Sequence, residues 1–180
     1  PVEVEKPVAP DTVETKVKKE TGLWGSKKYA EAHKNDSIFA MINLDMPGKV
    51  NGFNVMGFDT LRQAISDVVA HSGSFDLSSY MSVAWTNSDH MYFMFAGIPV
   101  ITPRGGLAKE MTAHYHDFAD TFDKVDKDYI SQASVATAFL VEGLARSPQP
   151  YFRMGSEEVK ELLRKHNLEK RLRSQEEYPF

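Results

Sequence analysis

The segment AHYHDFADTFDKVD, residues 113–126, contains two histidines and four aspartates, the densest group of potential metal ligands in the chain. The chain has no cysteine, so any metal site must use imidazole and carboxylate donors. That donor set suits zinc or another divalent ion. In an extended loop, side chains two residues apart point in opposite directions, so at most one of His114 and His116 should enter a given site. Asp120 and Thr121 could hold the loop or cap the next turn, and so fix the orientation of a ligating imidazole. The alternative is a polar surface loop with a capped helix behind it.

Two other segments carry side chains of similar chemistry. Asp45 follows an apolar run and precedes a Pro-Gly turn, while Ser88, Asp89 and His90 stand together at the start of a predicted short helix. Ligand sites of open α/β sheets form where loops leave the carboxyl ends of strands. Each segment also has a purely structural interpretation, because Asp45 could stabilise the turn and Ser88 or Asp89 could cap the helix.

The remaining histidines have structural interpretations. His33 and His166 lie in charged helical stretches, where solvated side chains are expected. His71 stands at the predicted end of a helix, where it can interact with the terminal carbonyl groups.

The elements that must position these residues follow from the spacing of apolar side chains. A near-continuous apolar run over 37–46 predicts a strand buried on both faces, and IPVITP (98–103) predicts a second buried strand. A shorter strand is expected over 80–85. One-sided apolar stripes predict helices over 60–71 and 127–146. Alternating strands and helices predict an α/β layered sheet with helices on both faces.

The ends of the chain differ from its middle. Residues 1–19 contain no Leu, Ile or aromatic side chain, which predicts an extended or mobile leader. Residues 148–180 predict a helical tail that begins acidic and ends basic, as the helix dipole favours, with Asn167 dividing it into two short helices. The part between them, residues 20–147, is expected to form the layered domain.

Overall composition excludes several function classes. The net charge of −4 and the isoelectric point near 5.9 argue against a general affinity for nucleic acid or anionic membranes. No apolar run approaches the roughly 20 residues of a membrane span. The sequence contains no G-x-S-x-G, phosphate-loop, G-x-G-x-x-G or H-E-x-x-H pattern, so the best-known hydrolase and nucleotide motifs are absent.

Four sequence blocks, taken in order, resemble one known family. The blocks are ETGLWGSKKYAE, AMINLDMPG, SDHMYFMFAGIPVI and YHDFADTFDKVD. Together they resemble the zinc-dependent aminopeptidases that include the bacterial leucyl aminopeptidases. Glutamate carboxypeptidase II, glutaminyl cyclase and the transferrin-receptor ectodomain are similar relatives. A chance match to one block is plausible, but four blocks in the correct order and spacing make the resemblance specific.

The resemblance implies roles for individual residues. The family pattern has two consecutive glutamates before Gly-Leu, of which the first is the general base for the hydrolytic water and the second binds zinc. Glu20 occupies the second position, whereas Lys19 stands at the position of the base. Asp45 is then implied to bind the other metal, and His116, rather than His114, to share a metal with Glu20.

The resemblance also implies that the segment with Ser88, Asp89 and His90 lines the substrate site without ligating metal. The family binds two zinc ions, and its other ligands, a histidine and a metal-bridging aspartate, lie in an amino-terminal half with no counterpart in this sequence. We therefore expect the carboxyl-terminal half of a peptidase domain. Two metals about 4 Å apart need a bridging carboxylate to offset their repulsion, so this chain alone should bind zinc weakly.

Three functions follow from the resemblance. The first is part of a di-zinc metallopeptidase that is inactive alone and acts on peptides when a second chain or a missing half completes it. The second is a non-catalytic, peptidase-like binding or scaffolding module, which Lys19 favours. The third is a single-zinc enzyme similar to glutaminyl cyclase. The family resemblance favours a periplasmic or extracellular location, and self-association is a further expectation.

Overall fold

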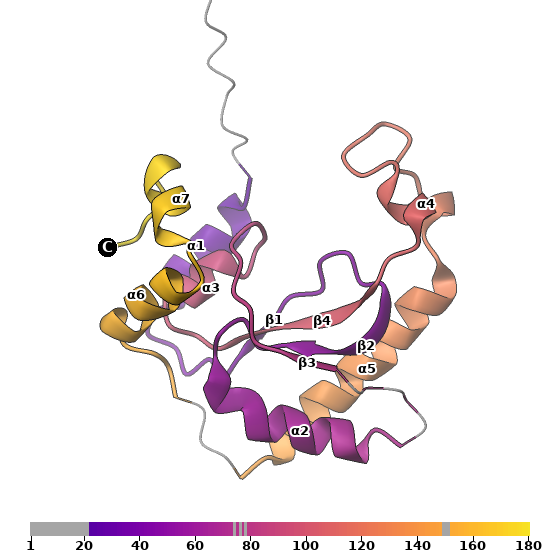
Figure 1. The fold of residues 1–180 in the computed structure, drawn as a ribbon, viewed down its shortest axis with the longest axis horizontal. Helices are drawn as coiled ribbons and strands as arrows, with labels where there is room; N and C mark the ends of the chain where they lie inside the picture. Colours follow the sequence, from indigo (N-terminus) through magenta and orange to yellow (C-terminus); the bar gives the residue numbers. More distant parts are fainter. Residues whose placement is uncertain (1–21, 74, 76, 78, 149–151) are drawn as a thin grey trace, which may run out of the picture.

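The computed structural model describes residues 22–73, 75, 77, 79–148 and 152–180. The predicted leader, which includes Lys19, lies outside the described residues, and so does Glu20. Four strands form one sheet in the order β1-β4-β2-β3 (Figure 1). Their bounds are Met41–Ile42 for β1, Lys49–Asn54 for β2, Ser79–Met81 for β3 and Val100–Gly106 for β4. β1 runs parallel to β4 and β2 parallel to β3, while β2 and β4 pair antiparallel.

The centre of this sheet is covered on both faces. Successive side chains of a strand point to opposite faces, and Val100 and Ile101 of β4 are both fully buried. Phe53 and Asn54 of β2 are buried in the same way. The predicted buried strand over 98–103 is therefore confirmed, although its pairing begins at Val100 and continues to Gly106.

The strand predicted over 37–46 differs from the expectation. Only Met41 and Ile42 pair as a strand, both are half-buried, and the flanking Phe39 and Leu44 are 69% and 49% exposed. Burial on both faces is therefore wrong for this segment. The reason is its position, because among the described residues β1 has a neighbour on one side only.

Two further strands depart from the sequence pattern. β3 spans Ser79–Met81 and so includes only Tyr80 and Met81 of the strand predicted over 80–85. β2 was not predicted, because KVNGFN has a glycine and two asparagines, residues that are depleted in strands. Pairing with β4 on one side and β3 on the other forms this strand despite its weak propensity.

Seven helices are present in the described residues. They are α1 (Trp24–Ala32), α2 (Arg62–His71), α3 (Met91–Phe95), α4 (Lys109–Thr112), α5 (Lys127–Arg146), α6 (Ser156–Lys165) and α7 (Glu169–Ser174). α2 and α5 agree with the helices predicted over 60–71 and 127–146, and a 3-10 turn over Asp59–Leu61 precedes α2. The predicted α/β class, a sheet flanked by helices, is confirmed.

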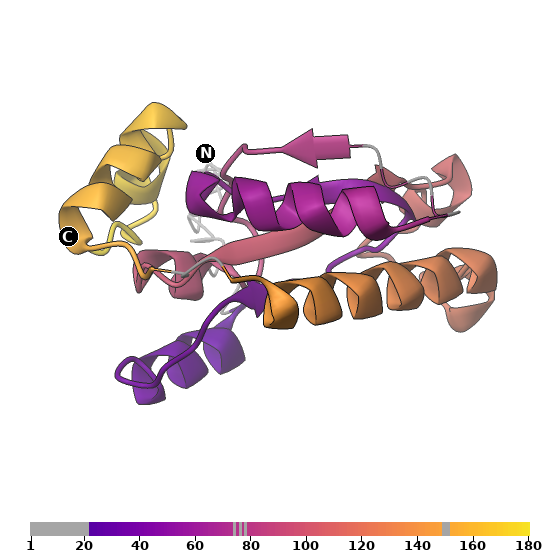
Figure 2. The ribbon, with the colours of Figure 1, turned by 90° about the horizontal axis from the view of Figure 1, so that it is seen from below.

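Six of the seven α-helices of the described residues form two groups, and α4 lies apart from both (Figures 1 and 2). α2 packs against α5, which also contacts β2 and β4. The second group contains α1, α3, α6 and α7. Within it, α6, α7 and the turn between them bury four leucines in the same apolar core as the sheet, namely Leu162, Leu163, Leu168 and Leu172. Asn167 has a positive φ of 58° between α6 and α7, so the predicted division of the tail is confirmed.

In the part of the chain that the structure describes, no helix is both long enough and apolar enough to cross a bilayer.

Candidate active site

A hollow of about 690 Å³ lies among the loops that follow β1, precede α3 and follow α4. Asp45, Ser88, Asp89 and His116 all line it, although they come from three separate segments. His114 is not among the residues that line this hollow. The fold therefore brings together four of the side chains selected from the sequence.

Asp45 is placed by the end of β1. The Asn43 N–H donates to the Ile101 carbonyl at 2.9 Å, which extends the β1–β4 pairing by one residue. The chain then turns through Met46, whose φ is 49°. Asp45 consequently stands, exposed, at the carboxyl end of a parallel strand pair, where α/β sheets form ligand sites.

His116 is placed by a tight turn after α4. The Asp117 N–H donates to the His114 carbonyl at 2.9 Å, and His116 has a positive φ of 62°. Such a backbone conformation is uncommon for a residue other than glycine. The imidazole lies against Tyr115, with 3.9 Å between the ring centroids. The segment is thus a turn and not the extended loop that the sequence argument assumed.

The segment Ser88-Asp89-His90 divides between the hollow and the core. Ser88 and Asp89 line the hollow, whereas His90 does not line it and is fully buried. The His90 ring meets the Trp85 ring edge-on at 4.3 Å between centroids. The three residues were predicted as substrate-binding. Ser88 and Asp89 line the hollow, whereas His90 lies in the core, so a substrate-binding role for the three residues stays a prediction.

The charged side chains that line the hollow are mostly acidic. Asp45, Asp89 and Glu177 line it, and no lysine or arginine of the described residues does so. Burial lowers the pKa of His90 below its usual value, opposed by the hydrogen bond to the Trp85 carbonyl and by the charges of Asp45 and Asp89. The hollow therefore presents negative charge above a neutral, buried imidazole.

The carboxyl-terminal tail forms part of the wall. Gln175 and Glu177 line the hollow, and the Arg171 guanidinium donates to the Thr86 hydroxyl close by. Sequence reasoning assigned no site residue to this tail. No local pattern indicates that residues 85 positions apart will meet, so no sequence signal could have identified this contact.

The described residues contain some, but not all, of the side chains that a zinc site needs. Asp45 and His116 offer donors that zinc accepts. However, no group of three His, Asp or Glu side chains able to hold a metal occurs among the residues that the structure describes. A catalytic zinc keeps three protein ligands. The described residues alone therefore do not make a complete zinc site, and Glu20, the third predicted ligand, lies outside them.

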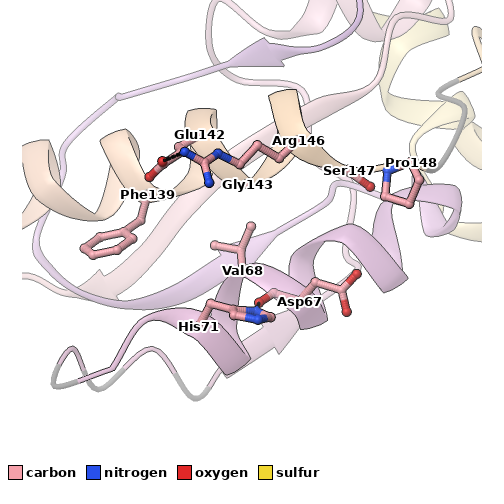
Figure 3. A pocket seen from close by; sticks show the side chains of 9 residues that line it. All are labelled: Asp67, Val68, His71, Phe139, Glu142, Gly143, Arg146, Ser147 and Pro148. Atoms are coloured by element: carbon pink, nitrogen blue, oxygen red, sulfur yellow. Dashed lines mark hydrogen bonds and ion pairs between the residues drawn. The ribbon is translucent and has the colours of Figure 1, made fainter.

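A second hollow, of about 400 Å³, lies between α2 and α5 (Figure 3). It contains none of the predicted site residues. Its polar groups are occupied with one another, since Arg146 pairs with Glu142 at 2.7 Å and His71 Nδ1 lies 2.7 Å from the Asp67 carbonyl oxygen. The expectation for His71, contact with carbonyls at a helix end, is confirmed.

His166 was expected to be solvated, and this is wrong. The Ala84 N–H donates to its Nδ1 at 3.3 Å, and its Nε2 is buried without a hydrogen-bond partner. The cause is the packing of α6 and α7 onto the loop after β3, which a pattern of charged residues does not reveal.

Asp45 stands at the carboxyl end of the parallel β1–β4 pair, and Ser88, Asp89 and His116 line the same hollow; in α/β proteins, ligand sites form at such a sheet edge. Comparison with models of protein families matches residues 18–141 to peptidase family M28. This match covers more than half of the chain, and the chain belongs to that family. The expected resemblance to zinc-dependent aminopeptidases is thereby confirmed.

Comparison with solved structures gives similarity to the aminopeptidase from Aneurinibacillus sp. strain AM-1. The identity is 26% and the TM-score 0.47, over 74% of this chain and 33% of that enzyme. The chain thus spans about a third of the length of that aminopeptidase. No match was found among the curated proteins.

Proposed function

We propose that this chain contributes one wall of the active site of an M28 peptidase that hydrolyses peptide bonds. The observation that carries the proposal is the gathering of Asp45, Ser88, Asp89 and His116 in one hollow, from segments that lie far apart in the sequence. Membership of the peptidase family supplies the reaction class.

In this proposal Asp45 and His116, with Glu20, are ligands of zinc. Because the described residues supply too few ligands, the remaining donors must come from outside this set, such as the other half of a peptidase domain or a second chain. Two zinc ions are proposed, as in the family. The acidic lining supports this role, since Asp45, Asp89 and Glu177 create a potential that favours a metal ion or the amino group of a peptide.

Lys19 carries a second candidate function. A protonated amine cannot accept a proton from water, and it adds positive charge beside a metal site. If Lys19 occupies the position of the general base, the chain keeps the peptidase fold but serves as a non-catalytic binding module. The peptidase and the binding module predict different results for Lys19→Glu in a protein that has all the zinc ligands. Turnover is restored if the chain is part of a peptidase, and it is not restored if the chain is a binding module.

The test measures zinc content and turnover of a leucine anilide. The unmodified chain should hold well under one zinc per molecule and show no measurable turnover. Lys19→Glu alone should change neither. Joining an amino-terminal M28 half that carries the missing histidine and aspartate, together with Lys19→Glu, should restore both.

Matched variants of the completed protein then test the ligand assignment. His116→Ala should lose zinc and turnover, whereas His114→Ala, two residues away, should retain both. Stoichiometric zinc and robust turnover in the unmodified chain would overturn the proposal. Zinc without turnover in the completed Lys19→Glu protein would favour the binding module.

A further inference from the structure

A buried chain of hydrogen bonds runs beneath the hollow from Trp85 to Ser88. His90 Nε2 lies 2.8 Å from the Trp85 carbonyl oxygen, and Asn43 Nδ2 lies 3.2 Å from His90 Nδ1. The same Asn43 amide donates to Ser88 Oγ at 3.0 Å. Asn43, Ser88 and His90 are 6%, 4% and 0% exposed, so water cannot substitute for these bonds.

The direction of each bond follows from the carbonyl at one end. A carbonyl oxygen only accepts, so His90 Nε2 must carry the proton that points to Trp85. Burial disfavours the charged imidazolium, so His90 Nδ1 is an unprotonated acceptor. A donor must therefore face Nδ1, which fixes the orientation of the Asn43 amide with its NH₂ group toward His90.

The Asn43 NH₂ group has two hydrogens, and both are now assigned. One is donated to His90 Nδ1 and the other to Ser88 Oγ. Ser88 thus accepts a bond from below. The Ser88 hydroxyl hydrogen must therefore point away from Asn43. Because Ser88 also lines the hollow, the hollow is the direction open to this hydrogen.

We infer that Asn43 and His90 are positioning residues that fix the Ser88 hydroxyl as a hydrogen-bond donor toward the hollow. The acceptor it suits is an oxygen of the peptide, either a carbonyl or a terminal carboxylate. This inference rests on the proposed function, because it assigns the polarity of one contact in that same site. It also gives His90 a role that does not require contact with substrate.

The first experiment records long-range ¹H–¹⁵N spectra of the histidine rings in the full chain without metal. The unmodified protein should show His90 with the proton on Nε2 and an unprotonated Nδ1. Asn43→Asp preserves the side-chain shape but replaces the donor by a carboxylate, which only accepts. The His90 Nδ1 signal should then move to the protonated range.

Asn54→Asp is the matched control. Asn54 is another buried asparagine at the end of a strand, 4% exposed, and it contacts Val83 and Met56 instead of His90. It should leave the His90 signals unchanged. A proton on Nδ1 in the unmodified protein, or an unchanged His90 spectrum in Asn43→Asp, would overturn the assigned direction of the bonds.

The second experiment follows the binding of the dipeptide leucyl-glycine through the backbone amide shifts of residues 86–91. Ser88→Ala removes the hydroxyl that donates to the dipeptide. Asn43→Asp places beside Ser88 a carboxylate, which accepts the Ser88 hydroxyl hydrogen and so turns it away from the hollow. Both changes should weaken binding about fivefold, as expected for one net hydrogen bond of about 1 kcal/mol. Asn54→Asp should bind the dipeptide as the unmodified chain does.

The outcomes separate this inference from the proposed function. Equal binding by Ser88→Ala and the unmodified chain overturns the role of Ser88, whatever the zinc and turnover measurements give. Absence of dipeptide binding by the unmodified chain overturns the substrate contact, while the histidine spectra still decide the direction of the bonds. Loss of peptidase function in the completed protein, with both experiments as expected, overturns the proposed function alone.

Discussion

At the scale of single residues, burial decides the charge of two histidines. Burial lowers the pKa of His90, and it is also the main cause that lowers the pKa of His166, helped by the charge of Lys165 and opposed by Asp59. Both rings make hydrogen bonds that join the segment between β3 and α3 to another part of the molecule. His90, at the end of this segment, contacts Asn43, and His166, at the end of α6, accepts from the Ala84 N–H within the segment. Their protonation is therefore coupled to the packing of that segment.

These shifts predict an acid-labile fold. In the unfolded chain a histidine binds its proton as the pH falls through about 6.5, whereas the buried His90 ring and the half-buried His166 ring bind it only at lower pH. The unfolded state then holds more protons, so the free energy of unfolding decreases as the pH falls through this range, by at most about 1.4 kcal/mol per pH unit for His90 and by less for the half-buried His166, where solvent screens the effect.

Urea denaturation between pH 7 and pH 5 tests this expectation. His90→Gln should be less stable than the unmodified chain at pH 7, because it disrupts a buried hydrogen-bond chain. It should nonetheless lose less stability on acidification, since one of the two groups that cause the slope is gone. His166→Gln should flatten the slope in the same sense. Slopes identical to that of the unmodified chain in both variants would contradict the assignment.

At the scale of elements, Gly97 joins the end of α3 to the segment that leads into the tail. Its φ is 73°, and a Cβ at this position would lie 2.0 Å from the Met154 carbonyl oxygen. The Met154 N–H also donates to the Gly97 carbonyl at 2.9 Å. α3 ends at Phe95, and the positive φ of Gly97 two residues later turns the chain away from the helix, while the close backbone approach holds the start of the tail beside it.

Gly97→Ala should therefore destabilise the protein through two effects. Positive φ costs an alanine about 1 kcal/mol relative to glycine, and the clash with backbone adds about 1–3 kcal/mol. Gly73→Ala is the control, because Gly73 has a φ of 62° but nothing within 4 Å of the added Cβ. Urea denaturation should show the larger loss for Gly97→Ala, and equal losses would show that the Met154 contact is unimportant.

At the scale of the whole molecule, the chain extends beyond the region that matches the peptidase family. The match ends at residue 141, yet Val159, Leu163 and Leu172 belong to the same buried cluster as the sheet. The tail also places Gln175 and Glu177 in the hollow. We therefore expect the tail and the sheet to unfold as one cooperative unit.

Leu163→Ala tests this cooperativity. Leu163 is fully buried, so the change should lower the free energy of unfolding by about 2–5 kcal/mol. Circular dichroism, which follows all helices, and tryptophan fluorescence, which includes the half-buried Trp85, should report the same shifted midpoint. Glu161→Ala, on the exposed side of α6, should change the midpoint little. Separate transitions for the two signals would indicate that the tail unfolds independently.

Local sequence determined much of this molecule. The apolar stripes of α2 and α5 indicate helices independently of the surrounding structure. Apolar side chains that recur with a period near 3.6 residues fall on one face only when the backbone is an α-helix. Asp45 and His116 could be selected as site residues because their sequence blocks carry the family resemblance. Asn167 could be placed at a helix end, since it interrupts a helical pattern.

Tertiary structure decided the rest, because pairing partners are not encoded in local periodicity. The run over 37–46 is apolar, but its exposure depends on how many strands lie beside β1. β2 forms because two neighbours pair with it, despite its weak propensity. The contact of Arg171 with Thr86 and the bonds from Asn43 to Ser88 and His90 join segments that only the folded chain brings together. These contacts decide that His90 is buried and neutral and that Ser88 faces the hollow.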